Sequence, residues 1–203
     1  MATMSSKQWY QVLLENYVTM EVKLAEQRTW RPIRVELHHP SVDWERIWLN
    51  LKLKGLNPDQ KSFCFKLLHN ILPTKSRLHR LKLKETPNCT HCNLGIVEDC
   101  FHALLSCPYN NDVNTWIADL LRDHLPALTP ENITTLNINL DPDMQFPVIW
   151  FLSTVFPLVW HLRQAKKAIS LYSIRADIEA KVNILRKSRL KDAARLVEEW
   201  INF

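Results

Sequence analysis

The chain has 203 residues, of which 46% are hydrophobic and only two, Gly55 and Gly95, are glycine. This composition favours a packed core over a disordered chain, and the scarcity of glycine argues against phosphate-binding loops and dinucleotide folds, which need glycine where backbone approaches phosphate. It also disfavours a hairpin-rich β protein, so we expect a mainly α-helical protein. The formal net charge of the chain is +5.

The cysteine content indicates a reducing compartment. Five cysteines without a recognisable secretory signal predict an intracellular protein, either nuclear or cytoplasmic. The odd number disfavours a disulfide framework, and Cys64 is expected to be a buried thiol.

The charge is segregated along the chain. Residues 52–84 contain nine Lys or Arg and one acid, Asp59, whereas residues 85–145 contain nine acids and one base, Arg122. A basic block can contact nucleic-acid phosphates, and a solvated helical face is the alternative interpretation.

The first forty residues are predicted to form a helix and a connector. Ser5 or Ser6 can cap a helix that runs to roughly Thr19, and residues 21–40, with two prolines, have the pattern of an irregular connector. We expect three parts in the whole chain: residues 1–40, a helical zinc-binding domain over 41–125, and a C-terminal helical region over 126–203.

A second and a third helix are predicted after this connector. Ser41 can cap a helix that ends near Gly55 and whose apolar stripe, expected in the core, consists of Trp44, Ile47, Trp48 and Leu51. The next helix is expected to begin at Asn57-Pro58, since Asn caps helices and Pro is tolerated at their first position, and to end near Leu72.

A short basic helix is predicted next, over Lys75 to Leu83, capped by Thr74. Leu78 and Leu81 are expected to point inward. The basic residues that crowd its outer side and the residues after it are Lys75, Arg77, His79, Arg80, Lys82 and Lys84.

The last third of the chain alternates helices and loops. A helix is predicted from Asn110 or Asn111 to about Leu125, then a loop over 126–145 with one short helix after Thr129. Residues 146–160 are the most apolar run. Fifteen residues fall short of the roughly 20 that a membrane span needs, so we predict a buried core helix, kinked near Pro157.

The C-terminal segment, residues 165–203, is predicted to be a long amphipathic helix, continuous or broken. Ile174, Ile178, Val182 and Leu185 follow helical spacing along it.

The strongest chemical signal lies in residues 89–107. Cys89 and Cys92 form a CxxC, and His102 and Cys107 form an HxxxxC nine residues later. Two close pairs of thiolate and imidazole ligands suit one tetrahedral Zn²⁺. Four protein ligands leave no position for an activated water, so we expect a structural site.

Two further residues leave the ligand set open. Cys100 lies two residues before His102, and His91 lies inside the CxxC, so either could compete for the metal.

These residues together resemble a known family. Trp44 and Trp48, the run F-C-F-K-L-L-H-N-I-L-P-T-K-S-R-L-H-R over residues 63–80, and C-x2-C-x9-H-x4-C-P resemble the zinc-binding region at the C-terminal end of non-LTR (LINE-type) retrotransposon reverse transcriptases. The resemblance covers roughly residues 42–116.

The resemblance implies a role in holding nucleic acid during reverse transcription. It implies that Cys89, Cys92, His102 and Cys107 hold the metal, and that Lys75, Arg77, His79, Arg80 and Lys82 contact RNA or DNA backbone. No Y/F-x-D-D motif of a polymerase is present, and Asp141-Pro-Asp143 lacks that context. We therefore expect a non-catalytic module.

Two hypotheses of function remain. In the first, the basic helix holds RNA or DNA without sequence specificity, Lys84 included, and no membrane is involved. In the second, the chain is a helical scaffold or protein-interaction module in which zinc is purely structural, and residues 174–196 bind a partner or a second copy.

Overall fold

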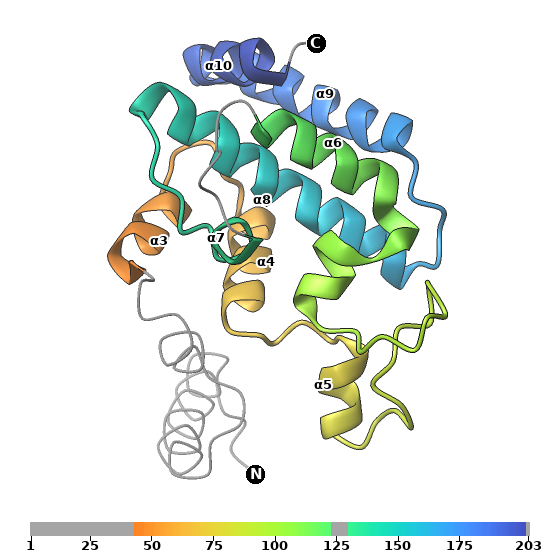
Figure 1. The fold of residues 1–203 in the computed structure, drawn as a ribbon. Coiled ribbons are helices and arrows are strands. Elements are labelled where there is room, and N and C mark those ends of the chain that lie inside the picture. The colour runs from red at the N-terminus through yellow and green to blue at the C-terminus, as the bar shows by residue number, and fades with distance from the viewer. Residues whose placement is uncertain (1–42, 123–129, 202–203) are drawn as a thin grey trace, which may run out of the picture. The chain divides into compact units, whose positions relative to one another are not determined.

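The computed structural model describes residues 43–122 and 130–201 (Figure 1). Contacts divide the chain into two units, Met1–Pro40 and Ser41–Phe203, and only the second unit contains described residues. The first predicted helix and the connector, as well as the cap expected at Ser41, lie outside the described residues.

The regular structure of the described residues is helical, which confirms the predicted fold class. One isolated antiparallel bridge joins Asn88 to Val97. The elements are α3 (Trp44–Leu51), α4 (Pro58–Leu68), α5 (Lys75–Arg80), a π-helical turn η1 (His102–Ser106), a 3₁₀ turn η2 (Pro108–Asn110), α6 (Asn111–Arg122), α7 (Pro130–Thr135), α8 (Pro142–Gln164), α9 (Leu171–Lys187) and α10 (Lys191–Ile201).

Helix α8 is the centre of this arrangement. It contacts α4, α9, α10 and η1, and Figure 1 shows it running between these elements. Residues 147–157 are buried without interruption, so this middle part of the helix is covered on all sides. Hydrophobic residues from both sides of the expected boundary at 125/126 belong to one core. The three-part division of the chain stays a prediction.

The length predicted for this apolar helix was too short. Helix α8 has 23 residues, because Pro142 begins it and polar residues extend it to Gln164. By length and composition it is the one helix among residues 43–122 and 130–201 that could cross a membrane, but 72% of its most apolar window is buried inside the structure. Burial, rather than length, identifies it as a core helix.

Caps fix both ends of α4. The Asn57 side chain accepts a hydrogen bond from the Gln60 backbone N–H, and the Gln60 side-chain oxygen accepts one from the Asn57 backbone N–H, as the Asn-Pro signal predicted. The predicted end near Leu72 is wrong. Asn70 adopts a left-handed conformation with φ 51°, and the Ile71 N–H donates to the Lys66 carbonyl, which closes a Schellman motif four residues earlier.

Left-handed residues other than glycine end further helices in the same way. Lys82, Leu136 and Lys166 have φ values of 58°, 57° and 53°, and each lies within two residues of the end of α5, α7 or α8. Gly55 was expected to end α3, but α3 ends at Leu51. Gly55 lies in the following turn, where φ is 101° and a Cβ would approach the Phe146 ring to 3.1 Å.

The C-terminal segment is broken, which was one of its two predicted forms. Ser188 to Leu190 separate α9 from α10, and the two helices contact each other and α8. Ile174, Ile178, Val182 and Leu185 of α9 are buried, so the face identified from helical spacing is the face that packs on the core.

Candidate metal centre

The two halves of the metal loop are joined by a short backbone ribbon. The Cys89 N–H donates to the Ile96 carbonyl at 2.7 Å, and the Glu98 N–H donates to the Pro87 carbonyl at 2.9 Å. Gly95, with φ 71°, provides the turn that was expected between the halves. This ribbon brings the end of the loop back beside the CxxC turn.

A π-helical turn aligns the second pair of ligands. In an α-helix, residues five apart are separated by roughly 140° around the axis and face away from each other. In a π-helix the i→i+5 bonding returns the chain to the same side after five residues. Because η1 begins at His102 and is followed directly by Cys107, both side chains lie on one side.

The four predicted ligands meet at one point. The sulfur atoms of Cys89 and Cys107 are 3.9 Å apart, and the Cys92 sulfur is 3.5 Å from His102 Nε2. Tetrahedral zinc with ordinary bond lengths separates two sulfurs by about 3.8 Å and a sulfur from a nitrogen by about 3.5 Å. All four ligand atoms lie within 4.8 Å of one another, so the cluster could hold one Zn²⁺.

The protein orients the histidine ligand through its second nitrogen. His102 Nδ1 lies 3.3 Å from the Ser106 hydroxyl, so a ring that binds metal through Nε2 donates its other N–H there. The Asp99 carboxylate accepts the His102 backbone N–H at 2.7 Å. Burial, helped by the positive charge of Arg163, lowers the pKa of His102, which favours the neutral ring that zinc needs.

The thiols respond to different neighbours. Burial raises the pKa of the Cys89 thiol, but hydrogen bonds from the backbone N–H groups of Cys92 and His91 and from Arg163 outweigh it, so that this pKa is lowered. Burial raises the pKa of Cys107. Cys89 is therefore the more readily ionised of the two facing thiols.

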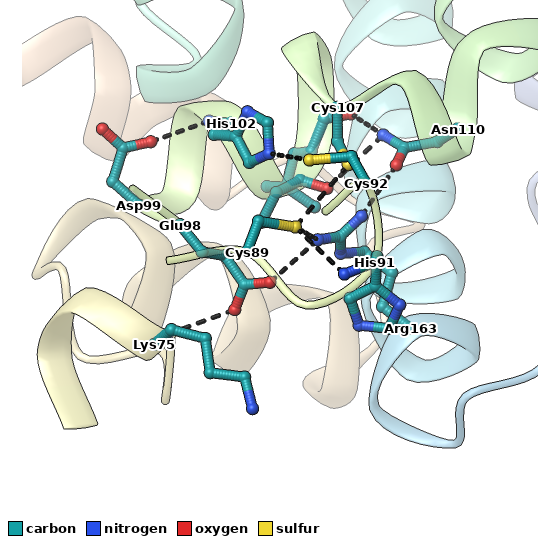
Figure 2. A network of polar contacts seen from close by, with 12 residues as sticks. Lys75, Cys89, His91, Cys92, Glu98, Asp99, His102, Cys107, Asn110 and Arg163 are labelled. Atoms are coloured by element: carbon teal, nitrogen blue, oxygen red, sulfur yellow. Dashed lines mark hydrogen bonds and ion pairs between the residues drawn. The ribbon is translucent and has the colours of Figure 1, made fainter. Parts of the chain in front are cut away.

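A buried polar network surrounds the ligands, as Figure 2 shows. Arg163 of α8 donates to the Cys89 sulfur at 3.4 Å, to Glu98 Oε2 at 2.9 Å and to Asn110 Oδ1 at 3.0 Å. The side chains of Arg163 and Glu98 are only 1% and 4% exposed.

Glu98 also connects the metal loop to the basic helix. Its other carboxylate oxygen accepts the Lys75 backbone N–H, and its carbonyl accepts the Ser76 N–H, both at 3.1 Å. The Thr74 hydroxyl accepts the Arg77 N–H, as the predicted cap requires. The first N–H groups of α5 are thus satisfied by the metal loop and by Thr74, which fixes the helix beside the site.

The two competing ligands lie elsewhere. The Cys100 thiol contacts Asn70 Oδ1 at 3.5 Å, and burial raises its pKa to about 12, which keeps it protonated. The His91 ring packs on Tyr109, with ring centroids 4.9 Å apart. Neither residue belongs to the cluster of four.

Only some of the predicted basic residues line a common pocket. A pocket of about 700 Å³ beside α5 is lined on its basic side by Lys75, His79, Lys82 and Lys84. Arg77 is half-buried and donates to the Asn70 carbonyl at 2.9 Å, which gives it a structural contact. Arg80 is exposed but does not line the pocket.

The inward orientation predicted for Leu81 is wrong. Leu81 is 55% exposed, and no residue of α5 is buried. The helix has only six residues, since the left-handed Lys82 ends it, and polar contacts of its backbone hold it in place.

Sequence reasoning missed Arg163, Glu98 and Asn110. Arg163 lies 65 residues from Glu98 and 74 from Cys89, so no local spacing connects them. Ser106 could have been identified from sequence spacing, because it is four residues after His102 on the same turn.

A family model described as zinc-binding in reverse transcriptase matches residues 5–116, more than half of the chain. The matched range contains the four ligands and α5, and it ends within α6, before α8 begins. Comparison with curated proteins and with solved structures found no match.

Proposed function

Since the chain belongs to the family of zinc-binding domains of reverse transcriptases, we propose that it is an accessory nucleic-acid-binding module derived from a LINE-type element. The family is distinct from the catalytic polymerase domain. The L-H-N-x-L-P-T-K-x-R-L run, residues 68–78, supports the LINE-type origin.

The observation that carries the proposal is the basic pocket beside α5. Lys75, His79, Lys82 and Lys84 line it together with polar Asn88 and Thr90, and Glu85 is its one acid. Ammonium groups around an open pocket bind phosphate by releasing counterions, and they do so without reading bases. We therefore expect RNA and DNA to bind through their backbones, without sequence specificity.

The metal centre gives this pocket its shape. Asn88 and Thr90 flank Cys89, and the Lys75 backbone is bonded to Glu98 of the same loop. Zinc in this arrangement contributes no chemistry to a substrate. It holds the loop so that the lysines converge, and its removal is expected to weaken nucleic-acid binding.

The test compares two variants with equal loss of charge. One carries Lys75→Gln, Lys82→Gln and Lys84→Gln. Its matched control carries Lys167→Gln, Lys187→Gln and Lys191→Gln, three exposed lysines outside the pocket. Binding of the zinc-loaded full chain to single-stranded RNA, single-stranded DNA and duplex DNA is titrated against salt.

We expect the pocket variant to bind more weakly and to have a shallower salt dependence, by roughly 0.7–0.9 in slope for each phosphate contact that is lost. Equal binding by the pocket variant and the unaltered chain would contradict the proposal. Equal weakening by both variants would point to diffuse attraction over the whole surface.

A second candidate function rests on a different observation. The residues around the metal loop expose large apolar side chains: Leu81, Leu83, Leu94, Ile96, Val97 and Phe101. Exposed apolar side chains are typical of protein-binding surfaces. In a scaffold function these residues, or α9 with its exposed Tyr172 and Ile184, bind a protein or a second copy. Concentration-dependent size without an effect of added oligonucleotide would favour this candidate.

A further inference from the structure

The guanidinium of Arg163 lies within the polar network that Figure 2 draws around the four ligands, and it donates to the Cys89 sulfur. Arg163 lies near the end of α8, outside residues 5–116 that the family match covers. It is 1% exposed, so its charge is removed from water. A buried cation needs compensating partners, because removing a charge from water costs several kcal/mol without them.

The negative charge of the metal centre provides this compensation. A divalent zinc ion with three thiolates and one neutral imidazole has a net charge of −1. Glu98, which is also buried, adds a second negative charge beside it. Arginine keeps its proton under all ordinary conditions, and its planar fork can serve two acceptors at once.

The guanidinium donates hydrogen bonds to both of these negative groups. Nη2 is 3.4 Å from the Cys89 sulfur and 2.9 Å from Glu98 Oε2, while Nη1 is held by Asn110 Oδ1 at 3.0 Å. Asn110 in turn donates to the Leu104 carbonyl of the π turn at 3.0 Å. The orientation of the guanidinium is therefore fixed from the ligand loop itself.

We propose that Arg163 is a positioning residue of the zinc centre, which stabilises the metal-bound Cys89 thiolate and makes α8 part of the metal site. Zinc affinity then depends on a helix outside the family's matched region. The proposal does not rest on nucleic-acid binding, since it concerns only the metal and its ligands.

A simpler role for Arg163 is to neutralise Glu98 alone. The two roles differ in one double variant, Arg163→Met with Glu98→Gln, which removes both charges of the buried pair and leaves neither unpaired. If Arg163 serves only Glu98, this variant binds zinc as tightly as Glu98→Gln alone. If Arg163 serves the thiolate, the double variant remains weaker than Glu98→Gln.

Zinc affinity of the full chain is measured by competition with a chromophoric chelator. We expect the double variant to bind zinc roughly 10–100-fold more weakly than Glu98→Gln, the range typical for residues that support metal ligands. The matched control is Arg195→Met, because Arg195 is exposed on α10 and pairs only loosely with Glu199 at 3.8 Å. Equal affinities of the double variant and Glu98→Gln would overturn the proposal.

A second measurement tests the proposal if the double variant does not fold. Arg163→Lys keeps the charge but loses the fork, and in the cobalt-substituted chain we expect it to move the sulfur-to-metal charge-transfer band to lower energy, because a thiolate that accepts a weaker hydrogen bond gives up electrons more easily. An unchanged band, with the same spectrum as the Arg195→Met control, would also overturn the proposal.

Discussion

The metal-loop region, residues 75–107, and the helices packed around α8 reach a fixed structure by different means. Around α8, residues 147–157 are buried without interruption, and α9 and α10 cover them with apolar side chains. In the metal-loop region α5 has no buried residue, and several large apolar side chains are exposed. Burial holds the first region, whereas a few ligand and polar contacts hold the second.

The two regions are therefore vulnerable to different changes. Loss of one apolar contact in the α8 region removes a fraction of a broad packing energy. Loss of one ligand in the metal-loop region removes the contact on which the others depend, because a closed structural zinc site needs all four ligands.

The largest effect is expected from Cys107→Ala. It should abolish zinc binding and withdraw the free energy that zinc supplies to folding, on the order of 10 kcal/mol in small zinc domains. Hydrogen exchange should then lose protection over residues 75–107 and in the last turn of α8, while α9 and α10 remain protected. Cys100→Ala is the matched control, since Cys100 is outside the cluster. Equal loss of protection throughout would show that the two regions do not differ.

A smaller effect, in which stability falls but zinc binding is kept, is expected from Phe151→Ala. Phe151 is fully buried in α8, and its ring meets those of Trp116 and Trp200 edge-on, with centroids 5.1 and 5.2 Å apart. Its truncation should cost about 3–5 kcal/mol of unfolding free energy, measured by urea denaturation, without changing zinc stoichiometry. Ile184→Ala, at an exposed position of α9, should cost far less. A chain that lost zinc in proportion to stability would contradict the separation.

The smallest effect is expected at the end of α8, where a residue other than glycine adopts a left-handed conformation. Lys166 follows α8 in the left-handed region, with φ 53°, which glycine adopts without strain. Lys166→Gly should therefore raise the unfolding free energy by about 0.5–1 kcal/mol. Its neighbour Lys167 has no such conformation, so Lys167→Gly should be neutral or destabilising. Thermal denaturation of both variants distinguishes the two expectations.

The sequence predicted what depends on residue type and short spacing. The four ligands were identified because thiolates and imidazole at close spacing have few other uses, and the structure brings them together. Asn57-Pro58 predicted the start of α4 because the capping signal is local. The apolar face of α9 was predicted for the same reason, since the helical period places its residues on one side.

Contacts over long separations could not be predicted. Arg163 had no signal in the sequence, because its partners Glu98 and Cys89 lie 65 and 74 residues away. The end of α4 was misplaced because Asn70 adopts the left-handed conformation, which ends the helix before Leu72. Leu81 was assigned inward by an amphipathic rule that requires a core beneath the helix, and α5 is held by backbone contacts instead.

The π turn His102–Ser106 limits how this loop can change in length. Insertion of one residue between His102 and Cys107 would place the two ligands six residues apart, roughly 120° from each other in α-helical geometry, so the metal would be lost although the loop is barely longer. An insertion in the ribbon near Gly95, where nothing lies within 4 Å of an added Cβ, would leave the ligands in register. Homologous chains should therefore vary in length between Cys92 and His102 more readily than they gain residues between His102 and Cys107.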